Sequence, residues 1–476
     1  MKVKINASKL KLGEIAEMCG GKLVLRGADE NTEIGYMCTD SREADAETLF
    51  AAIRGEKTDG NEYIGKAVAG GCRAILGETI PDETVTDDFG MVVVPDTVNA
   101  LGKIASEYKK RFDCLTVGIT GSVGKTTTKE FVASVLERKF RTYKTEGNHN
   151  SVIGMPLSVT EMPRDTEAAV FEMGMSGFGE ISLMSKAARP NIGIITTIGS
   201  SHIELLGTRE NILKAKTEII DGMAEDGILL LSGDDPLLIG ADKRGRKCLY
   251  VAIDNRDADF RALNIRTEIS KTTFDVLYDE KIYSNIEIPI MGQHNVYAAL
   301  FAFAVGMLSG MTADEIRSGL SAFRSPGMRQ HIYDVSGITI IEDCYNASPE
   351  SMRSAIDVLA ELSAKKSARP VALLGDMLEL GERSPAMHAE IGEYLARKGC
   401  KVLFTYGKLA ENIASSAAGN GMSPENIYVN RDKENRRTTE DMLMHALKKG
   451  DVLLLKASRG MAVEHFAEYI KNNPKF

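Results

Sequence analysis

The stretch that most constrains this chain is residues 117–130, which read VGITGSVGKTTTKE. An apolar run at 115–119, expected to be a strand, precedes its glycines, and a helical pattern follows them. The glycines allow a tight turn whose N–H groups converge on one anion at the positive end of the next helix. Lys125 is then placed to reach the β- and γ-phosphates of a nucleotide, and the Thr126 hydroxyl to ligate Mg²⁺. The predicted nucleotide-binding residues of this cradle are Gly121, Ser122, Val123, Gly124, Lys125, Thr126 and Thr127.

Length and composition exclude several classes of protein. At 476 residues the chain is too long for one core, and its net charge of -9 argues against a nucleic-acid partner. Its seven cysteines are scattered without a C-x-x-C pair, which argues against a zinc site and a disulfide framework and favours a reducing cytoplasm. The sequence shows neither a signal peptide nor an apolar run of the ~18 residues that span a bilayer, so we expect no membrane association.

The hydrophobic pattern predicts an α/β protein of three domains. We expect a small α/β domain at 1–96, a central P-loop domain with a mostly parallel sheet at 97–324, and a Rossmann-like doubly wound domain at 325–476. Between about 248 and 290 the apolar period becomes two, which predicts antiparallel strands added to the edge of the central sheet. The Pro-Gly pair at 326–327 marks a linker.

Two strand ends after the cradle carry candidate metal ligands. Glu172 ends the strand AAVFE, and His202 follows the next strand in TTIGSSHIE, so a parallel sheet would bring both beside the cradle. A satisfied strand-end carboxylate and an ordinary hydrogen-bonded histidine are the alternatives. Lys214 and Lys216 follow on a predicted helix, where most lysines are simply solvated.

The third segment offers one functional loop, IIEDCYNASPESM at 340–352. Asn346, Ser348 and Pro349 predict a turn that opens a helix, since proline suits the first helical position. Loops at the carboxyl ends of strands often bind ligands, although a plain strand-to-helix turn is the alternative. The segment has no G-x-G-x-x-G motif, so a dinucleotide is not expected.

Taken in order, these motifs resemble those of the Mur ligase family over nearly the full length of the chain. The matching stretches are GITGSVGKTTTKE, FEMGM, TTIGSSHIE, KAKTEI, MGQHNVYAAL, SPGMRQ and EDCYNASPESM. Within the family, LGDMLELGE and TDSRE are most similar to the member that adds D-alanyl-D-alanine. The resemblance implies a bacterial, cytoplasmic enzyme with UDP-binding, ATP-binding and dipeptide-binding domains.

The activity implied by the resemblance is an ATP-dependent amide ligation. The tripeptide carboxylate of UDP-N-acetylmuramoyl-tripeptide attacks the γ-phosphate of ATP, and D-alanyl-D-alanine displaces phosphate from the acyl phosphate, giving the pentapeptide. We expect a monomer. The alternatives are another Mur ligase that adds a diamino acid or glutamate, folylpolyglutamate synthetase, and a P-loop ATPase without ligation.

The family's functional residues carry over to matching positions here. The residues that match its catalytic groups are Lys125, His202, Lys216 and Arg329. The residues that match ligands of two Mg²⁺ ions are Thr126, Glu172, His202 and Lys216, the last being a lysine that many members carbamylate with CO₂. Further nucleotide contacts are implied for Asn295, Arg329 and Asp343. The implied substrate contacts are Ser41 and Arg42 at the uridine diphosphate and Asn346, Ser348, Lys456, Ser458 and Arg459 near the dipeptide.

Overall fold

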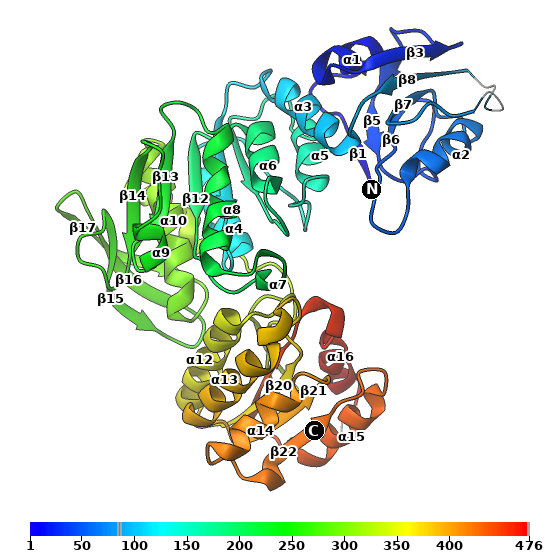
Figure 1. Ribbon diagram of the computed structural model, residues 1–476. Helices are drawn as coiled ribbons and strands as arrows, with labels where there is room; N and C mark the ends of the chain where they lie inside the picture. The colour runs from blue at the N-terminus through cyan, green and yellow to red at the C-terminus, as the bar shows by residue number, and fades with distance from the viewer. Residues whose placement is uncertain (83–84, 86–87, 474–476) are drawn as a thin grey trace.

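The computed structural model describes residues 1–82, 85 and 88–473. It contains three α/β bodies that follow one another along the chain, from the blue N-terminal body through the central body to the yellow-to-red third body (Figure 1). Each body is built on its own main sheet. The predicted fold class is therefore confirmed. The boundaries expected after residues 96 and 324 fall between these sheets and stay a prediction.

The N-terminal body has a six-stranded sheet in the order β1-β5-β6-β7-β8-β3. Strands β5 to β8 are parallel, while β1 and β3 pair antiparallel at the two edges. Its elements are β1 (Lys2–Lys4), β2 (Leu10–Lys11), α1 (Leu12–Cys19), β3 (Lys22–Arg26), β4 (Glu33–Ile34), β5 (Tyr36–Cys38), β6 (Thr48–Ala51), α2 (Ile64–Ala69), β7 (Ala74–Gly77) and β8 (Phe89–Val93).

The central body has a nine-stranded sheet in the order β10-β11-β9-β12-β13-β14-β15-β16-β17. Its strands are β9 (Leu115–Thr120), β10 (Thr142–Lys144), β11 (Ala168–Glu172), β12 (Ile192–Ile195), β13 (Ile228–Ser232), β14 (Lys247–Ala252), β15 (Phe260–Thr267), β16 (Thr272–Tyr278) and β17 (Lys281–Ile288). Its helices are α3 (Thr97–Lys109), α4 (Lys125–Leu136), α5 (Gly154–Thr160), α6 (Glu180–Ala188), α7 (Ile203–Leu206), α8 (Arg209–Thr217), α9 (Pro236–Ile239), α10 (Gln293–Leu308) and α11 (Ala313–Ser321).

Most strands of the central sheet have the burial and pairing that their sequences predict. β9, β11 and β12 are almost wholly buried apolar runs, as expected for parallel strands covered on both faces. Strands β15 to β17 form the predicted antiparallel edge. The expectation was wrong for β14, which pairs parallel with both β13 and β15 although it lies in the period-two stretch. Its side chains are partly exposed at the start of the strand and buried at its end, so this strand does not share the alternation of the antiparallel strands that follow.

The third body has a six-stranded sheet in the order β18-β19-β23-β20-β21-β22, parallel except for β18. Its elements are β18 (His331–Val335), β19 (Ile338–Glu342), α12 (Pro349–Lys366), β20 (Arg369–Gly375), α13 (Ser384–Arg397), β21 (Val402–Tyr406), α14 (Glu411–Gly419), β22 (Ile427–Asn430), α15 (Arg436–Ala446), β23 (Asp451–Lys456) and α16 (Glu464–Asn472). The carboxyl ends of β19 and β23 face the central body, which places their loops at the junction.

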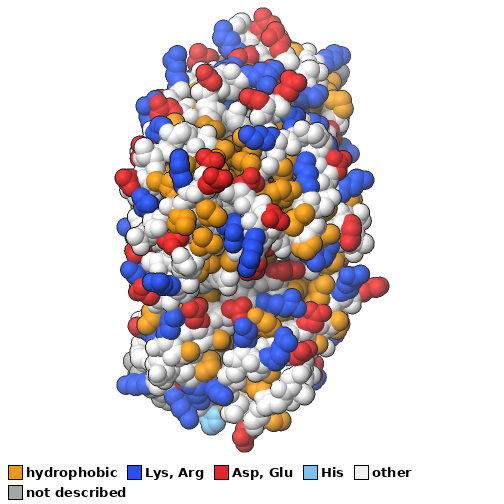
Figure 2. Space-filling model, turned by 90° about the vertical axis from the view of Figure 1, so that its left-hand side faces the viewer, with side chains coloured by type: hydrophobic (Ala, Val, Ile, Leu, Met, Phe, Trp, Pro, Cys, Tyr) orange, Lys and Arg blue, Asp and Glu red, His pale blue; other side chains and the backbone are white. Residues whose placement is uncertain are grey.

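The distribution of surface charge and the state of the cysteines agree with the composition of the chain. Acidic and basic side chains are intermingled over the face shown in Figure 2. All seven cysteines are free thiols. Within the part of the chain that the structure describes, no helix has the length and apolar character needed to cross a bilayer.

Candidate active site

The phosphate cradle connects β9 to α4 and depends on two glycines. A Cβ atom on Gly121 would lie 1.9 Å from Thr196 Oγ1, so only glycine fits there. Gly124 has φ 86°, a left-handed conformation that L side chains rarely adopt. The turn delivers Lys125 to the first position of α4, where its Nζ donates to the Gly121 carbonyl at 2.9 Å. The predicted cradle is therefore built as a loop that opens a helix.

Glu172 lies beside the cradle because β11 pairs directly with β9, with Glu172 opposite Ile119. Its side chain is buried, and Oε2 accepts a hydrogen bond from Thr126 Oγ1 at 2.8 Å. Oε1 accepts a second hydrogen bond from Asn150 Nδ2, also at 2.8 Å. Lys129 Nζ lies 4.0 Å from Oε2 on the buried side. Two of the predicted metal ligands are thus in direct contact.

Lys216 is buried, against the usual expectation for a lysine on a helix such as α8. Burial, together with the charge of Lys125, holds the pKa of Lys216 well below its usual value. Burial also lowers the pKa of Lys125, an effect that Glu172 opposes and Arg329 reinforces. Burial and the neighbouring ammonium of Lys125 thus both disfavour the charged form of Lys216.

His202 lies at the junction of the central and third bodies. It precedes α7 and has φ 62°, which is unusual for a residue with a side chain. Its Nδ1 atom lies 2.7 Å from Oε2 of Glu379, a residue of the third body. The neighbouring imidazole lowers the pKa of Glu379.

The linker delivers Arg329 into the same region. Its guanidinium lies 4.1 Å from the ring centroid of Tyr345, in cation–π contact. The neighbouring Gln330 accepts from Asn295 Nδ2 at 2.9 Å and donates to the Met291 carbonyl at 2.6 Å, so it ties the linker to the start of α10.

The third body contributes a capped helix and an ion pair between a buried lysine and a partly exposed aspartate. Lys456 Nζ, at the end of β23, lies 2.6 Å from Asp343 Oδ2 and donates to the Asn346 carbonyl at 3.1 Å. Ser348 caps α12 by accepting a hydrogen bond from Ser351 N, and Pro349 takes the first helical position. The predicted turn is therefore confirmed.

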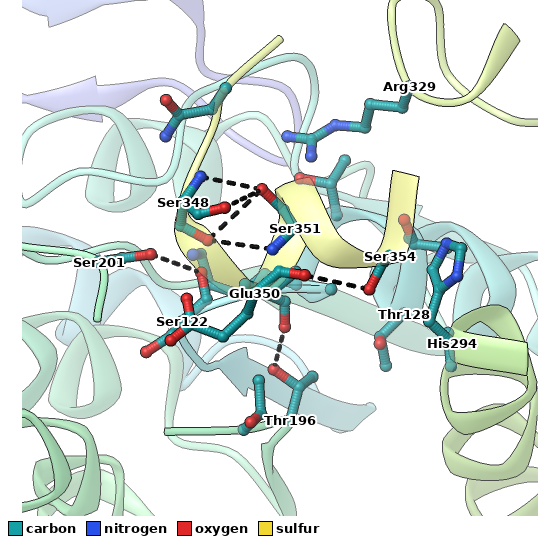
Figure 3. A pocket seen from close by; sticks show the side chains of 18 of the residues that line it. Ser122, Thr128, Thr196, Ser201, His294, Arg329, Ser348, Glu350, Ser351 and Ser354 are labelled. Atoms are coloured by element: carbon teal, nitrogen blue, oxygen red, sulfur yellow. Dashed lines mark hydrogen bonds between the residues drawn. The ribbon is translucent and has the colours of Figure 1, made fainter. Parts of the chain in front are cut away.

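These groups meet in one cleft of about 710 Å³ between the central and third bodies. In Figure 3, Glu350 of α12 lies toward Ser122 and Ser201 of the central body, and Arg329 points in from the linker. The predicted site residues that line the cleft are Ser122, Val123, Gly124, Lys125, Thr126, Thr127, Glu172, His202, Asn295, Arg329, Asp343, Asn346, Ser348 and Lys456. Lys216 lies beneath this lining, within electrostatic reach of Lys125.

Four predicted substrate residues lie outside this cleft. Ser458 accepts a hydrogen bond from Leu378 N at 2.9 Å, and Arg459 pairs with Glu464 at 2.7 Å, so both are engaged within the third body. Ser41 and Arg42 belong to the N-terminal body. The guanidinium of Arg42 lies 2.5 Å from Asp40 Oδ2, holds the pKa of Asp40 well below its usual range, and remains largely exposed.

The donor set fits Mg²⁺ shared with a nucleotide better than a metal held by protein alone. Over the described ranges 1–82, 85 and 88–473, no group of three or more His, Cys, Asp or Glu side chains could hold a metal ion. Mg²⁺ is commonly bound by one or two protein oxygens together with phosphate oxygens and water. The adjacent oxygens of Thr126 and Glu172 match that requirement.

Comparison with known proteins identifies the family. Models described as the Mur ligase middle domain, the Mur ligase glutamate ligase domain and the Mur ligase family catalytic domain match residues 119–306, 328–459 and 33–109, respectively. Over 472 residues the chain is 37% identical to the UDP-N-acetylmuramoyl-tripeptide--D-alanyl-D-alanine ligase of Bacillus subtilis (strain 168), covering 98% of this chain and 99% of that protein. The chain belongs to the Mur ligase family. The predicted resemblance is thereby confirmed.

Solved structures of the Mur ligase family share the whole architecture. A crystal structure of MurF from Acinetobacter baumannii superposes with a TM-score of 0.86 at 25% identity, covering 98% of this chain and 100% of that chain. A crystal structure of MurF ligase from Thermotoga maritima in complex with ADP gives a TM-score of 0.80 at 29% identity, covering 92% and 97%.

Sequence reasoning missed several polar residues that contact the predicted groups. Asn150, Gln330, Tyr345, Glu350 and Glu379 were not singled out, yet each touches a predicted residue or its loop. Asn150 follows GNH in a loop with no helix or strand pattern, and Glu350 and Glu379 act across the junction. The other four lie in quoted motifs, which is the signal they carried: Gln330 in SPGMRQ, Tyr345 and Glu350 in EDCYNASPESM, and Glu379 in LGDMLELGE.

Proposed function

We propose that this chain joins D-alanyl-D-alanine to UDP-N-acetylmuramoyl-tripeptide with ATP, giving the pentapeptide, ADP and phosphate. The observation that carries the proposal is the single cleft in which a P-loop, an acidic strand end and the polar loops of the third body meet. The printed activity of the B. subtilis relative, which aligns over nearly the whole of both chains, supports this choice of substrates. The T. maritima relative in complex with ADP supports ATP as the nucleotide.

The first step proposed is transfer of the γ-phosphoryl group to the tripeptide. A carboxylate oxygen of the tripeptide forms a bond to the γ-phosphorus, and the bond from that phosphorus to the oxygen bridging to ADP breaks. Both partners are anionic, so cations must offset their repulsion before they can approach. Lys125 from the cradle and Arg329 from the linker both line the cleft and fit that role.

The second step proposed is attack by the dipeptide amine on the acyl phosphate. The amine nitrogen bonds to the carbonyl carbon, the resulting tetrahedral centre collapses, and phosphate leaves with the electron pair of the breaking C–O bond. We assign the dipeptide to the loop around Asn346 and Ser348, which opens α12 into the cleft. Lys456, paired with Asp343, holds the same loop through the Asn346 carbonyl.

We propose two Mg²⁺ positions, one at Thr126 and Glu172 and one at His202 and Lys216. Bound Mg²⁺ would neutralise the phosphate charge during transfer. The low pKa of Lys216 supports its carbamylation, because only a neutral amine attacks CO₂. We further propose that Asn295 and Asp343 contact the nucleotide and that Ser41 and Arg42 bind the uridine diphosphate, for which an exposed guanidinium is suited.

The proposal also covers the cellular location, oligomeric state and partners of the enzyme. A precursor carrying UDP is made where nucleotides are available, so we place the enzyme in the bacterial cytoplasm, which its free thiols also suit. We propose that it acts as a monomer, without nucleic acid or membrane as partner. Its net charge of -9 and the intermingled charges of Figure 2 support the first exclusion.

A phosphate-release assay tests the function. With ATP and UDP-N-acetylmuramoyl-tripeptide present, release should depend on added D-alanyl-D-alanine and be much slower with D-alanine or L-lysine. Lys125→Ala should abolish turnover, because it removes the cradle's cation. Release that is independent of any amine would refute ligation and favour a simple ATPase, and a preference for L-lysine would favour a diamino-acid-adding member of the family.

A further inference from the structure

The third body holds the loop that carries His202 at two points. Glu350 Oε1, from the first turn of α12, accepts hydrogen bonds from Ser200 N at 2.9 Å and from Ser200 Oγ at 3.0 Å. Glu379 makes the second contact: its backbone carbonyl accepts from Glu204 N at 3.3 Å while its carboxylate approaches His202. Two residues of the third body therefore contact residues 199–204 from across the cleft.

Both residues at the second point have unusual backbones. His202 has φ 62° and Glu379 has φ 65°, each in the left-handed region that non-glycine residues seldom occupy. Such conformations persist where surrounding structure compensates for them, and they concentrate at functional sites. Here two of them meet across a domain junction, with Nδ1 of one residue 2.7 Å from Oε2 of the other.

The chemistry of this contact is that of a supported metal ligand. Histidines that bind metal commonly place their other ring nitrogen against a carboxylate, which sets the tautomer and the ring orientation. Nδ1 of His202 is buried 2.7 Å from the Glu379 carboxylate and has no aligned hydrogen-bond partner, so the two side chains meet in a close contact. Nε2 is the nitrogen left to act toward the cleft, which His202 lines. Glu379 comes from LGDMLELGE, the third-body motif between β20 and α13.

We propose that Glu379 is a positioning residue that acts through His202. When the third body is docked, its carboxylate lies against the Nδ1 edge of the His202 ring and leaves Nε2 for the second metal position. When the third body is not docked against the central body, His202 loses its contact with Glu379. Because the third body also carries the loop assigned to the dipeptide, the second metal position would be completed only when the amine-binding body is in place. This inference rests on the proposed function.

The experiment measures metal binding without turnover. Mn²⁺ is titrated into the full-length chain with the non-hydrolysable analogue AMP-PNP, and free Mn²⁺ is followed by electron paramagnetic resonance. The variants are Glu379→Ala, Glu379→Gln, and Glu382→Ala as a matched control, an exposed glutamate on the same loop. The side chain of Glu379 is about half exposed, so its truncation opens no cavity in the core. A thermal melt checks that each variant is folded.

We expect two Mn²⁺ ions per wild-type chain and a dissociation constant of the weaker site raised about tenfold or more in Glu379→Ala, the range seen when such supporting carboxylates are removed. Glu379→Gln should fall between, because the amide keeps the contact but not the charge. Glu382→Ala should match wild type. In turnover assays the Mg²⁺ concentration for half-maximal rate should rise in Glu379→Ala, with KM for UDP-N-acetylmuramoyl-tripeptide unchanged.

Two results would overturn the inference. If wild type binds two Mn²⁺ ions and Glu379→Ala binds them equally well, Glu379 does not position His202, although the ligase function stands. If wild type with AMP-PNP binds one Mn²⁺ ion only, the inference fails together with the assignment of His202 as a metal ligand. The dependence of phosphate release on D-alanyl-D-alanine tests the proposed function separately.

Discussion

Replacement of Glu172 by glutamine separates its chemical role from its structural one. The change keeps the shape of a buried side chain and removes only its charge. A glutamine carbonyl can still accept from Asn150 Nδ2, and its amide can donate to the Thr126 hydroxyl in place of accepting from it. Both neighbours therefore keep a partner, and the fold should survive.

The loss of stability can be bounded from these contacts. A hydrogen bond to a charged group contributes about 1.5–3 kcal/mol and one between neutral groups about 0.5–1.5 kcal/mol, so two weakened bonds lower the free energy of unfolding by about 2–3 kcal/mol. Relief from burying a charge offsets part of that. Such a loss leaves a protein with the usual stability of about 5–15 kcal/mol folded. Activity of the folded variant should nevertheless fall by about 100-fold, because removing even a supporting partner of a metal ligand lowers metal affinity by about 10–100-fold.

Phosphate release measured across a Mg²⁺ titration gives the activity and its metal dependence. Denaturation in urea gives the free energy of unfolding. Glu130→Gln is the matched control: Glu130 lies 3.1 Å from the same Lys129 but outside the cleft lining, so its removal changes the charge around that lysine without changing the proposed site. Its activity should stay within a few-fold of wild type. If Glu172→Gln folds and keeps the wild-type rate and Mg²⁺ dependence, Glu172 is not a metal ligand and the reasoning fails.

Three further outcomes are expected. Lys216→Ala should lose most activity and recover part of it with acetate or propionate, because a small carboxylate can take the place of the carbamate; no recovery would contradict carbamylation. Tyr345→Phe should keep kcat within about twofold and Tyr345→Leu should lower it several-fold, since a ring is needed to hold Arg329 by an interaction of about 0.5–2 kcal/mol; equal rates would argue against that support. Burial lowers the pKa of His388, so below about pH 6.5 the unfolded chain binds a proton that the folded chain does not, and stability should fall by up to about 1.4 kcal/mol per pH unit. Urea denaturation at about pH 7.5 and about pH 5.5 should show a smaller fall in His388→Gln than in wild type, and an equal fall would remove His388 as the cause.

The parts of the site that could be predicted lie on single strands or turns. Glu172 and the cradle follow from local pattern, because adjacent parallel strands end at one edge of a sheet. Ser348 and Pro349 predict the start of a helix from the sequence alone. The burial of Lys216 could not be predicted, since helical periodicity alone does not say which neighbours cover a face.

The contacts across the junction could not be predicted for a different reason. Glu379 is 177 positions from His202 in the chain, and Glu350 is 150 positions from Ser200, so each contact depends on how two separately folded bodies dock. No periodicity or capping rule encodes that arrangement. Glutamates in an exposed loop and in the first turn of a helix have ordinary solvated or dipole-related explanations, and only the docked structure distinguishes them.

The linker shows why docking and chemistry are coupled. Arg329 lies between Met328 and Gln330, whose φ angles of 61° and 47° are both left-handed. Each such residue costs about 1–3 kcal/mol unless its surroundings compensate. The compensating contacts come from both bodies: Gln330 binds Asn295 and Met291 of the central body, and the Met328 carbonyl accepts from Tyr345 N of the third body. Separation of the bodies would remove the contacts made by one of them, so the linker that positions Arg329 would lose part of its support. The cation that we propose for phosphoryl transfer is thus held by the same docking that brings the loop proposed for the dipeptide to the cleft.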